Sequence, residues 1–308
     1  MQFMLCHAHD HSCAFRYNTI MATLNEILER ATTEHWAVGH FNISNLEQMR
    51  VIVRMGKELG SPVMIGTSEG ERSHIGLLEA VALRDAFRKE FGIPIFLNAD
   101  HSKSVQTAKA AIDAGYDSIH IDLSACPFEE NVRGTTEIVA YARAKDRSTS
   151  VEGELGYLGG ESKIEKEKIE IKPEDLTKPD EARAFVHRTG VDRFASSVGN
   201  SHGISIDEPA IDIDRIRAIR HMLPASVSMV LHGGSGIPSE QIRAAIEAGI
   251  ANIHVNTDIR VAFVGGLREA IAEHPNETTP YKLFPEAEEA MAKVIEERIR
   301  LFRAVNKL

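Results

Sequence analysis

Three histidines of this sequence each stand just after a short apolar run, and their side chains could bind one metal ion. They are His101, His202 and His232. Short continuous apolar runs are typical of strands buried inside a parallel sheet. If these strands belong to a closed barrel, their C-terminal ends meet at one mouth, where barrel enzymes carry out their chemistry. Three neutral imidazoles at that mouth would form an open zinc site with one position left for substrate.

Acidic residues accompany these histidines at the expected strand ends. Asp100 directly precedes His101, so it can act as a general acid or base beside the metal, or orient a metal-binding histidine. Asp122, Glu152 and Glu154 lie on neighbouring expected strands. Glu152 and Glu154 are two residues apart and therefore share one face of a strand. Two inward carboxylates this close need a metal, a basic group or protons beside them.

Other histidines weaken an argument from position alone. The sequence contains 14 histidines, and His40 and His120 also lie near expected strand ends. A single histidine at such a place is commonly a hydrogen-bonded core residue. The metal hypothesis therefore depends on the three histidines together, two of which, His202 and His232, are followed directly by glycine.

Two loops have the composition of a phosphate site. One is the glycine-rich run 233–236, which precedes a helix expected from Pro238. The other is the run 256–258, which opens the last expected helix. Free backbone N–H groups at a helix N-terminus attract anions. In eight-stranded barrels the loops after the seventh and eighth strands commonly hold phosphate, so these loops predict a phosphorylated substrate.

The order of the elements predicts the fold. Expected strands cover residues 37–42, 63–66, 95–99, 118–123, 150–155, 193–198, 228–231 and 252–255. Expected helices between and after them cover residues 46–59, 77–91, 104–114, 128–146, 179–189, 213–221, 238–248 and 259–272. Eight such units indicate an α/β protein with a (β/α)8 TIM barrel, flanked by extra helices at 24–31 and 285–305. An open doubly wound sheet is the alternative, but the Gly-rich dinucleotide turn usual after its first strand is missing.

Composition narrows the setting in which the protein works. The chain has 308 residues, a net charge of −10 and three cysteines. Its apolar runs are far shorter than the ~20 residues that span a bilayer. A negative charge of this size disfavours nucleic-acid binding, because phosphate backbones require a basic face. Few cysteines in an odd number fit a reducing compartment, so we expect a cytoplasmic protein with neither nucleic-acid nor membrane partners.

Two segments depart from the strand–helix pattern. Residues 1–20 have no periodicity and contain Cys6, His7, His9, His11 and Cys13. They could form a metal-binding tail, but we expect a disordered extension upstream of a second start at Met21, with one barrel domain over 21–308. The polar stretch Gly156 to Pro179 is rich in Lys and Glu. Such a long loop at a barrel mouth is either a lid or a solvated run of charges.

Seven short motifs of the sequence occur together in a known order. They are Asn98-Ala99-Asp100-His101, Asp122-Leu123-Ser124, Val151-Glu152-Gly153-Glu154-Leu155-Gly156, Gly159-Gly160-Glu161, Gly199-Asn200-Ser201-His202-Gly203, Leu231-His232-Gly233-Gly234-Ser235-Gly236 and Asn256-Thr257-Asp258. In this order they resemble the class II, zinc-dependent fructose- and tagatose-bisphosphate aldolases. The resemblance runs from about Met21 to the C-terminus and implies a (β/α)8 barrel that forms a homodimer or homotetramer.

The resemblance also implies roles for individual residues. It assigns the catalytic zinc to His101, His202 and His232, and a second divalent or monovalent cation to Asp122 and Glu154. It assigns proton transfer to Asp100 and to an acid in the lid, for which Glu161 is our candidate in this sequence. The implied substrate-binding residues are Gly203, Gly233, Gly234, Ser235, His254, Asn256, Thr257 and Asp258. The implied reaction is reversible cleavage of fructose or tagatose 1,6-bisphosphate to dihydroxyacetone phosphate and glyceraldehyde 3-phosphate.

Three positions depart from the family pattern. His254 replaces an asparagine that contacts substrate, and Ser162 occupies the usual place of the lid acid, with Glu161 one position earlier. An arginine that helps to bind the second phosphate has no counterpart near 285–288, although Arg260 could supply that cation. A metal-dependent phosphosugar isomerase or epimerase, or a non-catalytic phosphosugar-binding barrel, is therefore the alternative function. No lysine closes an expected strand, so a Schiff-base aldolase is disfavoured.

Overall fold

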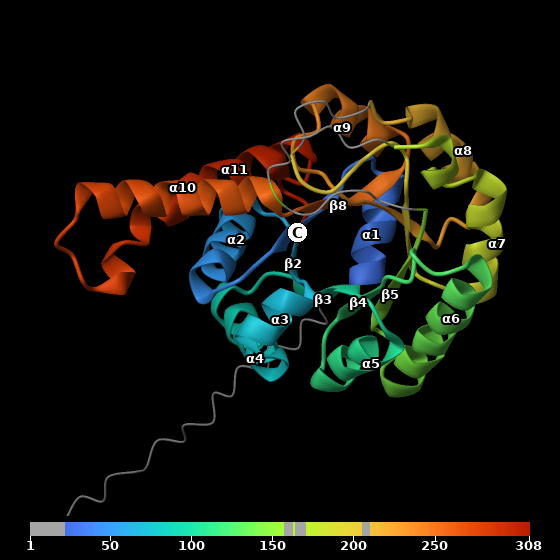
Figure 1. Ribbon diagram of the computed structural model, residues 1–308, viewed down its shortest axis with the longest axis horizontal. Helices are drawn as coiled ribbons and strands as arrows, with labels where there is room; N and C mark the ends of the chain where they lie inside the picture. The colour runs from blue at the N-terminus through green and yellow to red at the C-terminus, as the bar shows by residue number, and fades with distance from the viewer. Residues whose placement is uncertain (1–21, 157–162, 164–170, 205–209) are drawn as a thin grey trace, which may run out of the picture.

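The computed structural model describes residues 22–156, 163, 171–204 and 210–308. Within these residues eight parallel strands close into one barrel, in the order in which they follow along the chain. Helices surround the barrel, as Figure 1 shows. The predicted (β/α)8 fold is confirmed, and the open doubly wound sheet is excluded because the first strand pairs with the last. The expected extension 1–20 lies outside the described residues.

The strands and helices have the following bounds. The strands are β1 (Val38–Asn42), β2 (Val63–Thr67), β3 (Ile95–Ser102), β4 (Ser118–Ile121), β5 (Ser150–Leu155), β6 (Arg193–Ser196), β7 (Ser228–Leu231) and β8 (Ile250–Val255). The helices are α1 (Leu24–Thr33), α2 (Leu46–Leu59), α3 (Glu69–Ile75), α4 (Leu77–Phe91), α5 (Val105–Ala114), α6 (Phe128–Lys145), α7 (Pro179–Thr189), α8 (Ile213–Met222), α9 (Ser239–Glu247), α10 (Thr257–Glu273) and α11 (Pro285–Leu301). Two short 3-10 helices cover Pro173–Asp175 and Pro280–Lys282.

Helix α3 was not expected from the sequence. It spans seven residues between β2 and α4 and lacks a long apolar period. Its start is fixed by a capping box, in which the Ser68 side chain accepts from the backbone of Glu71 and the Glu71 side chain accepts from the backbone of Ser68. The S-x-x-E spacing was visible in the sequence. The helix places Ser68 and Glu71 at the C-terminal end of β2, on the side where the predicted site lies.

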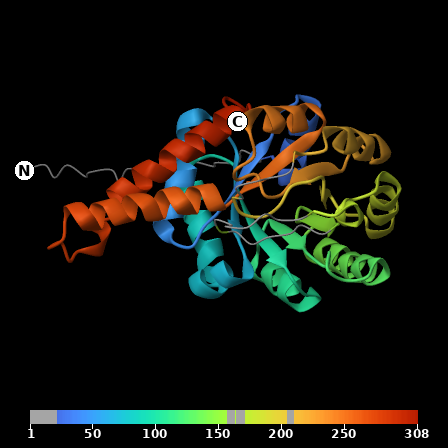
Figure 2. The same cartoon turned by 45° about the horizontal axis from the view of Figure 1, so that its top comes forward.

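Helices α10 and α11 form an arm beside the barrel. They pack along each other, and α11 also packs on α2. Figures 1 and 2 show the far ends of both helices extending well beyond the ring of the other helices. The first turn of α10 nevertheless belongs to the barrel mouth, because the helix begins at Thr257, directly after β8. No helix in the described part of the chain is long and apolar enough to cross a membrane.

The barrel interior contains a buried positive charge. Arg193 begins β6 and has no exposed surface. Its Nη1 lies 2.5 Å from Glu152 Oε2 and donates to Asn252 Oδ1 at 3.1 Å. Its Nη2 donates to the side chains of Ser118 and Asn98. Barrel interiors are usually filled by branched apolar side chains, so this polar layer below the mouth requires near-complete pairing of its groups.

We predict that Arg193→Leu destabilises the protein strongly. The substitution leaves Glu152 buried without its guanidinium partner, and breaking a buried ion pair typically costs about 3–5 kcal/mol of unfolding free energy. Arg183→Leu is the matched control, because the Arg183 side chain on α7 is 63% exposed. Urea denaturation followed by circular dichroism measures both variants. Equal stability of the two variants would contradict the importance of the buried pair.

Candidate active site

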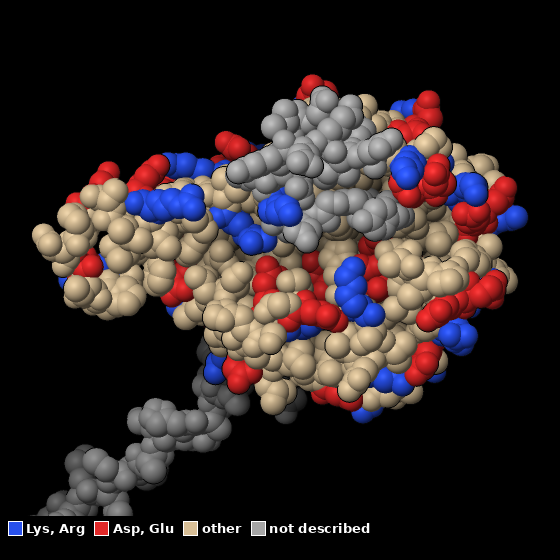
Figure 3. Space-filling model, viewed as in Figure 1, with Lys and Arg blue, Asp and Glu red and all other residues tan. Residues whose placement is uncertain are grey.

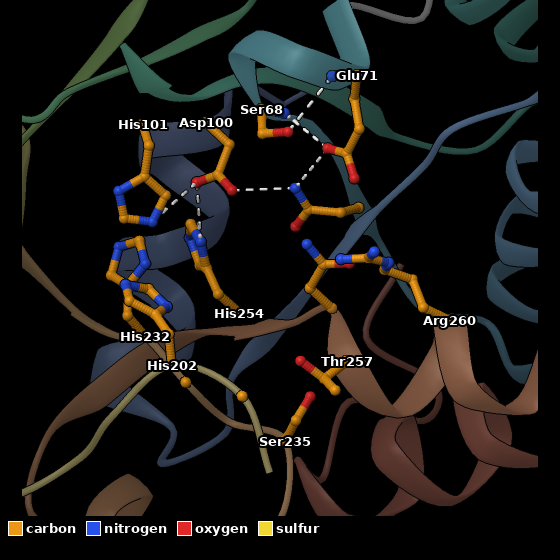
Figure 4. A pocket seen from close by; sticks show the side chains of 14 residues that line it. Ser68, Glu71, Asp100, His101, His202, His232, Ser235, His254, Thr257 and Arg260 are labelled. Atoms are coloured by element: carbon orange, nitrogen blue, oxygen red, sulfur yellow. Dashed lines mark hydrogen bonds and ion pairs between the residues drawn. The ribbon is translucent and has the colours of Figure 1, made fainter. Parts of the chain in front are cut away.

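A cavity of about 130 Å³ opens at the C-terminal mouth of the barrel. Eleven of the residues singled out from the sequence line it, namely Asp100, His101, His202, Gly203, His232, Gly233, Ser235, His254, Asn256, Thr257 and Arg260. Asn42, Ser68 and Glu71 complete the lining. Figure 4 shows the imidazoles on one side, Ser235 and Thr257 below them, and Glu71 and Arg260 on the other side of Asp100. The cavity therefore has three chemically distinct regions.

An irregularity in β3 turns two consecutive side chains toward this cavity. Neighbouring residues of a regular strand point to opposite faces. Between Ala99 and Ser102 the pairing of β3 with β4 shifts in register. Within this shift His101 has a φ of 43°, in the left-handed region that residues other than glycine rarely adopt. Such bulges redirect side chains near active sites, and here both Asp100 and His101 line the cavity.

The Asp100 carboxylate is held from both sides. Asn42 Nδ2 donates to Asp100 Oδ2 at 3.0 Å, and His254 Nδ1 lies 3.3 Å from Oδ1. Burial alone would raise the pKa of Asp100, but the charge of His101 and the nearby rings of His120 and His254 hold this pKa well below its ordinary value. Asp100 is therefore a carboxylate at neutral pH. It is fixed in position and able to accept a proton.

Two histidines are oriented by buried carboxylates. His101 Nδ1 donates to Asp122 Oδ2 at 2.6 Å, and His232 Nε2 donates to Glu152 Oε1 at 2.7 Å. Each bond occupies one ring nitrogen and leaves the other for a metal, which is the usual arrangement around metal-binding imidazoles. The other oxygen of Asp122 accepts from Ser124, and Lys103 also binds this carboxylate. Asp122 therefore orients His101 in this structure.

His202 completes the predicted trio from the loop after β6. Its ring centroid lies 4.9 Å from that of His101 and 5.9 Å from that of His232. Burial, together with the charge of His101, lowers the pKa of His202 to about 3, so its imidazole is neutral and has a lone pair for a metal. The rings of His101 and His232 are 4.8 Å apart. Three imidazoles thus surround one point, and this donor set suits zinc.

Two compact groups of donor atoms include His120, which the metal hypothesis left out. Asp100, His101, His120 and His232 form one such group, with all donor atoms within 4.8 Å of one another. His101, His120, Asp122 and Glu154 form a second group, which includes both residues predicted for a second cation. Among the described residues, no group this compact contains His202. His120 itself is fully buried, with Nε2 3.1 Å from Glu154 Oε2.

A further compact group, His40, Asp100 and His254, does not fit a metal. The rings of His40 and His254 stack with centroids 3.6 Å apart and an interplanar angle of 11°. Imidazole lone pairs lie in the ring plane, so the lone pairs of two stacked, nearly parallel rings lie in separate planes and do not converge on one ion. Asn98 instead fixes His40. Arg193 and Ser118 donate to Asn98 Oδ1, so the Asn98 amide is left to donate to His40 Nε2 at 3.0 Å.

The proposed phosphate loops lie on the opposite side of the cavity from Asp100. Gly203 and Gly233 both have positive φ and line the cavity with Ser235 and Thr257. The N-cap residue Asn256 makes no side-chain capping bond to α10, so the first amides of that helix are not capped by it. Ser235 Oγ accepts from the backbone of Asp258 at 3.1 Å. This combination of glycines and a helix N-terminus suits an anion.

Two predicted substrate-binding residues do not line the cavity. The Gly234 amide donates to the His254 carbonyl at 2.8 Å, so it is occupied within the barrel. The Asp258 carboxylate pairs with Arg298 of α11. Glu161 and Ser162 fall outside the described residues. Asn42, Ser68 and Glu71 were missed, although each lies at or just after the end of an expected strand.

Comparisons with known proteins agree on one family. The family model for "Fructose-bisphosphate aldolase class-II" matches residues 22–307. A fructose-bisphosphate aldolase from Geobacillus stearothermophilus is 37% identical over 290 residues, which cover 93% of this chain and 98% of the relative. The crystal structure of the YdjI aldolase from Escherichia coli K12 aligns with a TM-score of 0.75 at 28% identity, covering 93% of this chain and 98% of the other.

A second solved structure is also similar. It is a putative fructose-1,6-biphosphate aldolase from Coccidioides immitis, with a TM-score of 0.78 and 27% identity. The alignment covers 91% of this chain and 95% of that one. These matches span the barrel and the arm together. The face of the molecule shown in Figure 3 carries interspersed acidic and basic side chains.

Proposed function

We propose that this protein is a zinc-dependent aldolase for a phosphorylated ketose. The premise is that the chain belongs to the class II fructose-bisphosphate aldolase family and is therefore a carbon–carbon lyase. The products are dihydroxyacetone phosphate and an aldehyde. Fructose 1,6-bisphosphate is the first candidate substrate and tagatose 1,6-bisphosphate the second. The observation that carries the proposal is the Asp100 carboxyl group beside three imidazoles in one cavity.

The residues that would hold the metal are His101, His202 and His232. A zinc ion bound there would act as a Lewis acid that polarises the carbonyl group of the ketose. Asp122 and Glu152 hold two of these imidazoles in position through hydrogen bonds of 2.6 and 2.7 Å. A second cation would bind to the group of donor atoms that contains Asp122 and Glu154.

Asp100 is the base of the proposed cleavage. It would take the proton from the hydroxyl group on the carbon of the breaking bond that belongs to the aldehyde fragment, and this C–O bond becomes the carbonyl of the aldehyde. The electron pair of the broken C–C bond stays with the three-carbon fragment, which then takes up a proton. We propose Glu161 as the source of that proton, on the sequence pattern alone. In the reverse direction Asp100 returns its proton to the forming hydroxyl.

The chain's own residues support the metal route over a Schiff base. A Schiff-base aldolase needs an amine at the reacting carbonyl. Among the described residues no lysine is buried in the barrel.

The phosphate of dihydroxyacetone phosphate would bind to Gly203, Gly233, Ser235 and Thr257, with Asn256 beside them.

We also propose that the enzyme is a cytoplasmic homodimer or homotetramer. Helix α10 carries the exposed apolar side chains Val261, Val264 and Ile271. Their spacings of three and seven residues place them on one face of the helix. This helix belongs to the arm that extends beyond the barrel (Figure 2). An exposed apolar stripe on a projecting helix is typical of a protein–protein contact.

We predict that His202→Ala loses the metal. The purified wild-type protein, loaded with zinc, should retain about one ion per chain at the trio, whereas the variant lacks one of three ligands and should retain much less after dialysis. His221→Ala, on the exposed surface of α8, is the control. Elemental analysis gives the zinc content. Full zinc retention by the His202→Ala protein would show that His202 is not a ligand.

We predict that Asp100→Asn separates metal binding from cleavage. Asparagine keeps the shape of the side chain but cannot accept the hydroxyl proton, so kcat should fall by ~10²-fold or more. Zinc content should stay at the wild-type level. Asp214→Asn, a change of a 92% exposed side chain, should alter neither quantity. A coupled assay of triose phosphate release measures the rate, and near-normal turnover by Asp100→Asn would remove Asp100 from the proposed chemistry.

A further inference from the structure

The Glu71 carboxylate lies on the wall of the cavity, and the proposed mechanism gives it no role. It comes from α3, the helix absent from the sequence-based prediction. Its Oε2 accepts from Asn42 Nδ2 at 3.0 Å and from the Ser68 backbone N–H at 2.7 Å. Within the described residues Oε1 has no hydrogen-bond donor, and Figure 4 shows Glu71 at the edge of the cavity opposite the imidazoles. One carboxylate oxygen is thus fixed and the other remains for a ligand.

The position of Glu71 along a bound ketose follows from its neighbour Asn42. The Asn42 amide donates to both Asp100 Oδ2 and Glu71 Oε2, each at 3.0 Å. The two carboxylates are therefore joined through a single amide group. The imidazoles would face the ketose carbonyl and Asp100 would face the hydroxyl at the breaking bond. Glu71 then faces the next carbons, at the end of the aldehyde fragment.

A carboxylate at this place favours a hydroxyl group over a phosphate. An ionised carboxylate accepts a strong, charge-assisted hydrogen bond from a hydroxyl. A phosphate would instead add negative charge beside Glu71 and Asp100. Burial raises the pKa of Glu71 above its ordinary value, and the hydrogen bonds from Asn42 and Ser68 offset this only in part. A hydroxyl donor would stabilise the ionised form at this buried position. Arg260 lines the same cavity and supplies a positive charge there.

We infer that Glu71 extends the substrate class to ketose 1-phosphates, by binding the terminal hydroxyl groups of the aldehyde fragment. The inference rests on the proposed aldolase function. It explains why the end of the cavity away from the imidazoles contains an acidic residue, Glu71, beside a basic one, Arg260, where a phosphate site would contain only basic residues. The wild-type kcat/KM for fructose 1,6-bisphosphate should then exceed that for fructose 1-phosphate by less than ~10³-fold, since a hydroxyl has a partner of its own.

The test is Glu71→Gln, with Glu69→Gln as the control. Glutamine keeps the capping oxygen for Ser68 and Asn42, because Gln serves the capping box as well as Glu does. It replaces the other carboxylate oxygen by an NH2 group, which removes the negative charge and the acceptor for a substrate hydroxyl. The ratio of kcat/KM for the bisphosphate over the monophosphate should rise at least about tenfold in Glu71→Gln, the scale of one charge-assisted hydrogen bond. Glu69 lies on the same helix but does not line the cavity, so its variant should keep the wild-type ratio.

A binding measurement separates this inference from the proposed reaction. Hexitol 1-phosphate and hexitol 1,6-bisphosphate have no carbonyl group and cannot be cleaved. Calorimetry with the zinc-loaded protein should show that Glu71→Gln weakens hexitol 1-phosphate about tenfold and leaves the bisphosphate unchanged or tighter. Equal effects on both ligands, or none, would overturn the role of Glu71. A selective effect on binding in a protein that releases no triose phosphate would overturn the aldolase proposal alone.

Discussion

The buried contact between Glu152 and Arg193 is the interaction on which the mouth of the barrel depends. Glu152 uses one oxygen for Arg193 and the other to hold His232. Arg193 in turn fixes the amide of Asn98, which sets the orientation of His40. A carboxylate in a dry interior is stable only with such partners. The position of the His232 imidazole is therefore set from inside the barrel.

The same buried polar contacts are connected to Asp100, the proposed base, through the stacked rings of His40 and His254. His40 supports His254 from below, and His254 contacts one oxygen of Asp100 while Asn42 holds the other. Both β1 and β8 therefore position a residue of β3. Closure of the barrel is what brings these strands together, since β1 pairs with both β2 and β8. The fold and the chemistry thus share one set of contacts.

Much of this arrangement was predictable from the sequence, and the rest was not for physical reasons. Alternating apolar runs and helical patterns gave the eight strand–helix units, because burial on both faces leaves a clear signal in the strands. The end of β3 differs, since its bulge turns Asp100 and His101 the same way and no period shows this. Glu71 was missed because its seven-residue helix has no apolar stripe. The closeness of His120 to the other donor atoms arises only when the barrel closes, and the sequence pattern carries no information on such contacts.

The central claim is that His101, His202 and His232 hold a metal with a position left open beside Asp100. X-ray absorption spectroscopy of the zinc-loaded protein tests it most directly. We expect three imidazole nitrogens at about 2.0–2.1 Å with exchangeable oxygens as the remaining ligands, and only two imidazole nitrogens in His202→Ala. Three imidazole nitrogens retained in His202→Ala would place the ion at His101, His120 and His232. Two imidazoles with two carboxylate oxygens would place the ion among His101, His120, Asp122 and Glu154 instead. That closed shell would contradict an open catalytic site at the mouth.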